Sequence, residues 1–514
     1  MTTLSDTEKN ENLPVRKNVV AASLASTLLL QVITLISGLI LPRILISAFG
    51  SEMNGLVSSV TQILNYITLL EGGVGGVVTA SLYRPLAEND RRKISGIVNA
   101  TERFFRRVAL IYVVYVAATA LIYPSFLRGG ESYWYIAALI CVVGSSLFVQ
   151  YFFSLTARLL LKADRHVTFL SLTQSLLILL NLLLVVASVR LFDDLLIVKA
   201  VSALVFFLQP LIYGIFIKRK YKLDKTVPPD TDSLRQRWSG FGQNLAFFIH
   251  TNTDIVILTL FMPLSAVSVY TVYFAVANSL KTLVAALSSA VIPSIGNIAA
   301  QDDKERTAGA FDLYEFAVSF ITFVLFTCAI LLIVPFVGVY TRGITDADYI
   351  QPVFGVLILV AEMLYCLRDP YVSIAYTAGH FRQTAPYAYA EAAINIVLSL
   401  LLVPRFGLIG VAAGTAVSMA VRMILQVLYT KNRIIMRPVS KCVSRLVVFG
   451  VASGASILLF KYVFPAADIT DYGDWTLRAA EVSAVVLLMM TAAAALFFGK
   501  ELKATATRLL GRRR

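Results

Sequence analysis

Charged side chains interrupt the long apolar stretches of this sequence at only a few places. Six of them lie deep within such stretches: Glu71, Asp254, Lys281, Glu362, Arg368 and Asp369. Three more lie nearer the ends: Arg43, Glu391 and Arg422. A charge near the centre of a bilayer costs about 2.5–3.5 kcal/mol on insertion scales, so it usually faces a cavity or an oppositely charged partner. These residues are therefore the first candidates for a binding site, although Arg43 could simply extend to the headgroups.

Lys281 is the sharpest of these candidates, because it lies in the middle of its apolar stretch, one turn from Asn278. There it could contact an anionic ligand headgroup. Alternatively, it could form a salt bridge with Asp254 or Glu71 that only holds the helices together. Arg368 has the same two interpretations, a ligand contact or a structural pair with a carboxylate.

The buried carboxylates are candidates for ion coupling. Glu71 precedes a glycine-rich segment at 72–76, which allows close helix approach or a broken helix. This acid could bind a proton or a cation, or it could neutralise a basic residue. Glu362 and Asp369 are seven residues apart and share one helix face, and Pro370 should kink that helix. The candidates for binding a coupling proton or sodium ion are Glu71, Asp254, Glu362, Asp369 and Glu391.

Uncharged polar residues follow single faces of the first two apolar stretches. One stripe consists of Ser23, Thr27, Gln31 and Thr34, and the other of Gly55, Ser59, Gln62, Tyr66 and Gly73. Such stripes line a polar cavity or pack helices through small residues, and packing is the commoner cause. If a cavity is present, its tyrosines could contact sugars; the candidates are Tyr66, Tyr270 and Tyr273.

Motifs for other chemistry are missing from the sequence. It has no metal-ligand cluster, phosphate-binding loop or nucleophile motif, and its four cysteines are far apart. We therefore expect neither an enzyme nor a resident metal or cofactor.

The elements that must position these residues are membrane-spanning helices. Of 514 residues, 58% are hydrophobic and 15% charged, with a mean hydropathy of +0.75. A soluble domain is nearer half apolar and a quarter charged. About fourteen stretches are long enough to span a bilayer. They lie at 19–46, 54–82, 108–127, 134–157, 169–189, 195–217, 242–262, 265–292, 314–340, 350–377, 384–404, 407–430, 446–463 and 479–499.

Lysine and arginine alternate between rich and poor loops along the chain. The loops after the second, fourth, sixth and twelfth stretches and the C-terminal tail are basic, and the intervening loops are nearly bare. This pattern places both termini in the cytoplasm of a multi-pass protein of the cell (inner) membrane. It also explains the net charge of +14 without a nucleic-acid partner.

A weak internal repeat appears when the chain is shifted on itself by about 213 residues. The segment from Ser81 then lies over that from Ser294, and Asn65 lies over Asn278. Six-helix repeats share one orientation and predict two pseudo-symmetric lobes around a transport site. The predicted parts are a tail at 1–18, an N-lobe at 19–217, a basic linker at 218–241, a C-lobe at 242–430, two appended helices at 431–499 and a basic tail at 500–514.

Three segments resemble a known family of membrane proteins. The run from Leu41 to Leu56, the segment from Glu71 to Leu86 and the run from Phe406 to Ala416 are similar to Wzx-type polysaccharide flippases. These belong to the multidrug/oligosaccharidyl-lipid/polysaccharide (MOP) exporter superfamily, and the last run is shared with MurJ-type lipid II flippases. The resemblance covers nearly the whole chain.

The resemblance implies a MATE/MurJ-like fold with a central cationic cavity and alternating access. It implies a flippase that moves an undecaprenyl-diphosphate-linked oligosaccharide to the outer leaflet for polysaccharide assembly. Anionic lipids and polysaccharide-assembly proteins are the expected partners. Arginines of helices 1, 2 and 8 commonly serve the diphosphate in this superfamily, and here the basic residues of those helices are Arg43, Arg84 and Lys281.

Two other functions fit the same residues. One is an ion-coupled exporter of drugs or small metabolites, of the MATE or major facilitator type. The other is a membrane glycosyltransferase or polymerase, against which the short loops and three histidines argue.

Overall fold

The computed structural model describes residues 17–71, 74–127, 131–231, 241–299, 304–435, 437–463 and 469–509. Within these residues the chain is helical and contains no β-strand. In chain order the elements are α1 (Lys17–Leu64), η1 (Asn65–Glu71), α2 (Val74–Ala87), α3 (Arg91–Ile122), η2 (Tyr123–Phe126), α4 (Tyr133–Val149), η3 (Gln150–Ser154), α5 (Leu155–Ala163), α6 (Val167–Leu191), α7 (Leu195–Lys220), α8 (Phe241–Phe261), α9 (Leu264–Ala299), α10 (Lys304–Tyr340), α11 (Pro352–Thr377), α12 (Phe381–Phe406), α13 (Leu408–Thr430), η5 (Lys431–Ile435), α14 (Ser440–Tyr462), α15 (Tyr472–Phe497) and α16 (Gly499–Leu509).

Long apolar helices dominate this list. In the described part of the chain, 11 helices are long and apolar enough to cross a membrane. Large apolar side chains on their outer faces are exposed, for example Val114, Leu183, Leu401 and Leu488. Such continuous apolar surface suits lipid rather than water. The chain is an all-α polytopic membrane protein, as the sequence predicts.

The three remaining predicted spans are also helical. The stretch 54–82 consists of the second half of α1, the 3₁₀ segment η1 and α2, so this helix is broken near its glycines. The helix α8 covers the predicted stretch 242–262 as Phe241–Phe261. The helix α11 carries Glu362, Arg368 and Asp369 within its 26 residues.

The chain divides into two compact units. Unit 1 comprises Met1–Leu41, Val74–Ser125 and Gly130–Arg237, and unit 2 comprises Pro42–Gly73, Phe126–Gly129 and Trp238–Arg514. The second half of α1, which the sequence assigned to the N-lobe, therefore groups with unit 2.

Close backbone approach explains this grouping. The chain turns at Gly50, whose φ of 85° favours glycine. One turn further, a Cβ added to Gly55 would lie 1.8 Å from the carbonyl oxygen of Leu264 on α9. Beside it, Asn54 Nδ2 donates a hydrogen bond to Ser268 Oγ at 2.8 Å. The polar stripe of this segment thus packs helices together.

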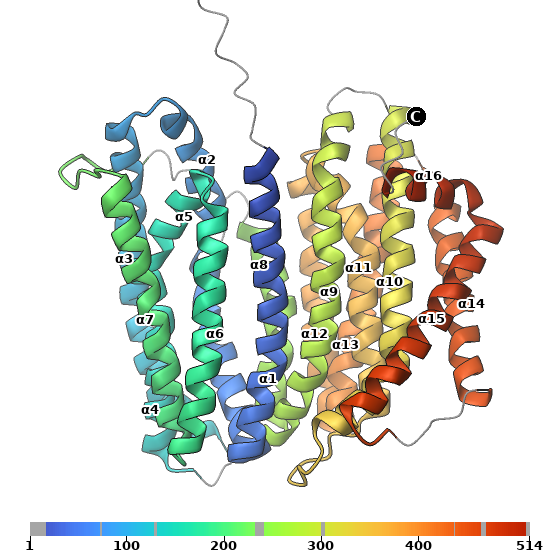
Figure 1. Ribbon diagram of the computed structural model, residues 1–514, viewed down its shortest axis with the longest axis horizontal. Coiled ribbons are helices and arrows are strands. Elements are labelled where there is room, and N and C mark those ends of the chain that lie inside the picture. Colours follow the sequence, from blue (N-terminus) through green and yellow to red (C-terminus); the bar gives the residue numbers. More distant parts are fainter. Residues whose placement is uncertain are drawn as a thin grey trace, which may run out of the picture. The chain divides into compact units, whose positions relative to one another are not determined.

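Within unit 2, α12 and α13 pack tightly because of two glycines. A Cβ on Gly410 would lie 2.7 Å from the carbonyl carbon of Leu402, and one on Gly414 would lie 2.9 Å from Ser399 Oγ. The turn between the helices is Gly407, with φ of 53°. Figure 1 shows α14 and α15 beside α10, with the short helix α16 near the N-terminal end of α10.

Candidate functional site

Glu391 on α12 is paired with two arginines inside unit 2. Its Oε2 accepts hydrogen bonds from Arg368 Nη1 of α11, at 3.0 Å, and from Arg422 Nη1 of α13. All three side chains are buried, with at most 9% exposed. Neither arginine Nε has a hydrogen-bond partner within the described residues. Two cations thus share one carboxylate, and this triad carries one net positive charge.

Lys281 on α9 is paired with Glu362 on α11, with 3.0 Å between Nζ and Oε2. The sequence pointed to Asp254 or Glu71 as its structural partner, but the contacting carboxylate is Glu362, because α9 packs along α11. The Lys281 ammonium lies 5.0 Å from the ring centroid of Tyr365, and Arg368 Cζ lies 4.6 Å from the same ring. Tyr365 therefore joins this pair to the triad.

We call the joined set the charge network; its members are Lys281, Glu362, Tyr365, Arg368, Glu391 and Arg422. Glu362 and Asp369 share a face of α11, as their spacing predicts. Both side chains meet α9: Glu362 contacts Lys281, and Asp369 lies near Ser288, two turns further along α9. The network thus joins four helices, and Asp369 adds a further carboxylate close to Arg368. The helix α11 itself continues through Pro370 to Thr377.

Asp254 on α8 is the centre of a second cluster, in which its hydrogen-bond partners are uncharged side chains. Its Oδ2 accepts hydrogen bonds from Tyr270 of α9 and Thr415 of α13, both at 3.0 Å. Asn395 of α12 donates to Thr415 Oγ1 at 2.9 Å. Three buried oxygens here have no hydrogen-bond partner among the described residues: Asp254 Oδ1, Asn395 Oδ1 and the Oγ of Ser399, one turn from Asn395. We call Asp254, Tyr270, Asn395, Ser399 and Thr415 the oxygen cluster. Its members Asn395, Ser399 and Thr415 were not singled out from the sequence.

The predicted tyrosines have structural contacts. The Tyr270 ring is buried and its hydroxyl is used by Asp254. Tyr273 donates to the carbonyl of Tyr349 at 2.8 Å and accepts from the amide of Gln351 at 3.0 Å. Tyr66, in η1, packs edge-on against Phe248, with 5.0 Å between the ring centroids.

Other predicted residues lie apart from both clusters. Arg43 Nη2 donates to the carbonyl of Arg342 at 2.8 Å. Arg84 is exposed and pairs with Glu88 at 2.7 Å. Among the asparagines, the carbonyl of Asn65 accepts from Thr68 and that of Asn278 from Thr282. The side chain of Glu71 lies outside the described residues.

A third set of charges was missed. Asp312 and Glu315 on α10 bind Arg437 and Arg445, and Lys441 pairs with Asp312 at 2.9 Å. The sequence treated these three basic residues as loop charges, yet the Arg445 side chain is only 2% exposed. The available signal was a pair of acids three residues apart, Asp312 and Glu315, at the start of an apolar run. They lie eight and eleven residues after Lys304, the first described residue of α10.

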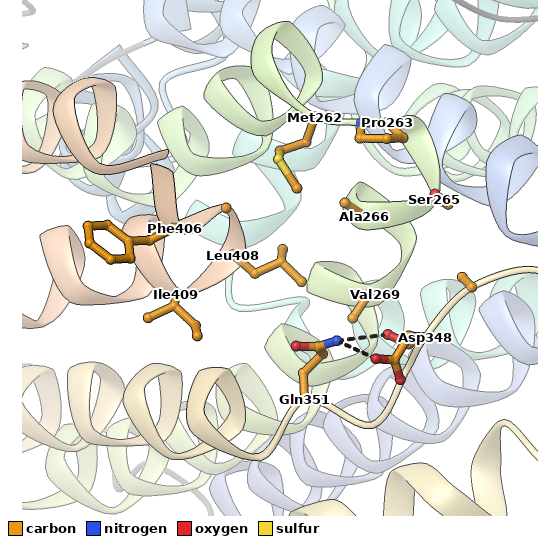
Figure 2. Close-up of a pocket in the computed structure, with 12 residues that line it drawn as sticks. Met262, Pro263, Ser265, Ala266, Val269, Asp348, Gln351, Phe406, Leu408 and Ile409 are labelled. Atoms are coloured by element: carbon orange, nitrogen blue, oxygen red, sulfur yellow. Dashed lines mark hydrogen bonds between the residues drawn. The ribbon is translucent and has the colours of Figure 1, made fainter. Parts of the chain in front are cut away.

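A cavity of about 390 Å³ opens elsewhere in unit 2, where the connections after α8, before α11 and after α12 meet. Figure 2 shows its apolar wall of Met262, Leu408 and Phe406 opposite Asp348 and Gln351. Gln351 Nε2 donates to Asp348 Oδ2 at 3.0 Å. The charge network is not part of this lining.

The two clusters offer distinct chemistry. Guanidinium groups match phosphate oxygens with pairs of parallel hydrogen bonds, so the triad suits an anionic ligand that competes with Glu391. Buried carboxylate, amide and hydroxyl oxygens suit a proton or a hard cation such as sodium. In the described part of the chain no group of three or more His, Cys, Asp and Glu side chains could hold a metal ion.

No protein-family model matches the sequence, and no curated protein matches it. Solved structures do match. A lipid II flippase MurJ in an inward closed conformation is similar over 94% of this chain and 100% of its own, with a TM-score of 0.73 and 14% identity. An inward-facing multidrug resistance MATE transporter of the MOP superfamily matches 79% of this chain and 97% of its own, with a TM-score of 0.60 and 16% identity.

The outward-facing form of such a transporter has a TM-score of 0.54, at 16% identity over 81% of this chain and 98% of its own. The chain therefore has the fold of MOP-superfamily transporters, which the sequence resemblance predicted.

Proposed function

We propose that this chain is a flippase for polyprenyl-diphosphate-linked oligosaccharide, which it moves across the cytoplasmic membrane for cell-surface polysaccharide assembly. The observation that carries the proposal is the triad, in which one carboxylate serves two buried arginines. Charges inside spanning helices are costly, so their presence calls for a reason beyond packing. The shared fold with a lipid II flippase supports the same conclusion.

In this mechanism the diphosphate competes with Glu391 for Arg368 and Arg422 while the polyprenyl tail stays in lipid. Lys281 provides a third cation along the same network. Alternating access of two lobes would then carry the headgroup and its sugars past the hydrocarbon. Both termini would lie in the cytoplasm, where the basic loops favour them.

The oxygen cluster would couple transport to an ion gradient. Asp254 is 3% exposed and has one oxygen without a hydrogen-bond partner in the described structure, so it could take up a proton or contribute to a sodium site. A single charge moving through 100 mV provides about 2.3 kcal/mol. An Asp254→Asn variant should lose the stimulation of flipping by a sodium or proton gradient while still binding the lipid.

The test of substrate is flipping of a fluorescent polyprenyl-diphosphate oligosaccharide in proteoliposomes. We expect Lys281→Ala and Arg368→Ala each to reduce the flipping rate at least about tenfold. Each variant loses one charge-assisted contact of roughly 1.5 kcal/mol, which corresponds to about a factor of ten. Arg478→Gln is the control, because Arg478 pairs with Glu481 on α15 and belongs neither to the charge network nor to the oxygen cluster. Normal flipping by both alanine variants would show that the headgroup site is wrong.

A double variant separates binding from packing. In Lys281→Ala with Glu362→Ala, no lone buried charge remains, so a purely structural pair would be harmless to lose. We expect the double variant to be folded and still defective in flipping. Flipping restored to the wild-type rate would assign the pair to structure alone.

The rival function is export of small cationic compounds, which the likeness to MATE transporters favours. Transport of such cations by the purified protein, with no flipping of the lipid-linked glycan, would establish it.

A further inference from the structure

A second cavity, of about 270 Å³, lies in unit 1 where four segments of the chain meet. These are the turn between α2 and α3, the first turn of α3, the turn between α5 and α6, and the segment that follows α7. Its polar lining consists of Asn89, Arg91, Asp164, Lys220, Tyr221 and Lys222. None of these residues belongs to the charge network or the oxygen cluster.

The walls of this cavity are fixed by hydrogen bonds. On α3, Asn99 Nδ2 donates to the carbonyls of Asp224 and Val227 at 3.0 and 2.9 Å. The amide of Asp230 donates to the carbonyl of Gly96 at 3.0 Å, and a Cβ on Gly96 would lie 3.3 Å from the Pro228 carbonyl. The segment after α7 is therefore held along the first turns of α3, so the cavity is part of the fold.

The cavity is positively charged. Lys220 is neutralised, because Asp164 accepts hydrogen bonds from Lys220 and from Tyr221. Burial alone would raise the pKa of Asp164, but these two donors bring it below its ordinary value. Arg91 and Lys222 form no ion pair among the described residues, so two positive charges remain.

Two further features of the backbone lie beside these cations. The N-terminus of α3 is already capped, because the Asp90 carboxylate accepts a hydrogen bond from the amide of Lys93 at 3.0 Å. The turns beside the cavity contain Asn89 and Arg165, with φ of 53° and 61°, the two non-glycine residues with positive φ in the described chain. Backbone strain of this kind is often found where a turn shapes a binding site.

We propose that this cavity binds a phosphate-bearing anion, either the headgroup of an anionic phospholipid or a soluble phosphate compound. The cavity lies among the basic loops that the sequence places on the cytoplasmic side, at the level of the headgroups. The two uncompensated cations, Arg91 and Lys222, match a phosphate, and the volume suits a small headgroup. The proposal does not depend on the transported substrate.

Binding to the purified full-length protein in detergent tests it, with two probes. The lipid probe is short-chain phosphatidylglycerol, with phosphatidylcholine of the same chain length as reference, and the soluble probe is inorganic pyrophosphate. The test variant is Arg91→Gln with Lys222→Gln. The control is Arg92→Gln with Lys225→Gln, which removes the same charge from exposed neighbours outside the cavity.

Each cation near a headgroup changes lipid affinity about fivefold, so the test variant should bind its probe about 30-fold more weakly, and the control less than about threefold. Loss for phosphatidylglycerol alone identifies the lipid headgroup, and loss for pyrophosphate alone identifies a soluble phosphate. If neither probe binds the wild type, or if test and control variants lose equally, the proposal is overturned. The thermal unfolding of both variants, whose mutated side chains are exposed, checks that they are folded.

Discussion

Replacing Glu391 by glutamine would leave two buried arginines facing each other. Both guanidinium groups donate to the same carboxylate oxygen, so their charges lie within about 5–6 Å of each other. At an effective dielectric constant of about 20, two like charges at that separation repel by about 3 kcal/mol. Breaking a buried ion pair on one side typically costs about 3–5 kcal/mol. We therefore expect Glu391→Gln to lower the free energy of unfolding by about 3–5 kcal/mol.

Unfolding by SDS in mixed micelles, followed by circular dichroism, measures this loss. Glu481→Gln is the matched control, because Glu481 is 39% exposed and pairs with Arg478 in a single helix. Partly exposed pairs of this kind are worth about 1 kcal/mol or less.

The double variant Glu391→Gln with Arg422→Gln tests the cause of the loss. Removing one arginine abolishes the repulsion, so the double variant should be more stable than Glu391→Gln alone by at least about 1.5 kcal/mol. The electrostatic reasoning fails if Glu391→Gln lies within about 1 kcal/mol of the wild type, or if the second substitution restores nothing.

Three further predictions concern packing, the third set of charges and pH. Gly55→Ala should lower the free energy of unfolding by about 3 kcal/mol, the upper end of the usual range for overpacking, because the added Cβ would lie 1.8 Å from a backbone carbonyl oxygen. Gly38→Ala, whose added Cβ meets open space, should be near neutral in the same SDS unfolding experiment. Arg445→Met should lower the free energy of unfolding by about 3 kcal/mol, because it leaves buried carboxylates short of a partner. Lys441→Gln should lower it by less than about 1 kcal/mol, because the Lys441 side chain is 49% exposed. Equal losses would contradict the burial argument. Burial and a neighbouring lysine ammonium hold the pKa of His166 below its ordinary value of 6.5, so the unfolded chain binds the proton more readily than the folded chain. The wild type should therefore lose stability as the pH falls from about 7 through that lowered pKa. Thermal unfolding of His166→Gln should show a flatter pH profile.

The helices could be predicted because apolar length is a local property. Fourteen ranges were expected, and each contains a helix or a broken helix of the described structure. The ends were less accurate where charges occur inside a helix: α10 begins at Lys304 rather than near 314, since its first turns are polar. The short amphipathic helix α16 lies in the predicted basic tail and was not expected.

The charged residues of the site could be named, but their partners could not. Depth in an apolar run singled out Lys281, Glu362 and Arg368, and Glu391 and Arg422 were named as charges nearer the ends of such runs. The structure brings all five together. Which acid meets which base depends on how four helices face one another. That is why Lys281 was matched with the wrong carboxylate.

The sequence by itself determined that the chain is a helical membrane protein and which of its charges must be sheltered from lipid, because length, hydropathy and charge cost are properties of single segments. Only the tertiary structure decided that one carboxylate serves two arginines, that Asp254 lies among uncharged oxygens, and that Arg437 and Arg445 are buried. Those outcomes depend on helix rotation and close approach. Both are set by packing at positions such as Gly55, Gly410 and Gly414, where the backbones nearly touch.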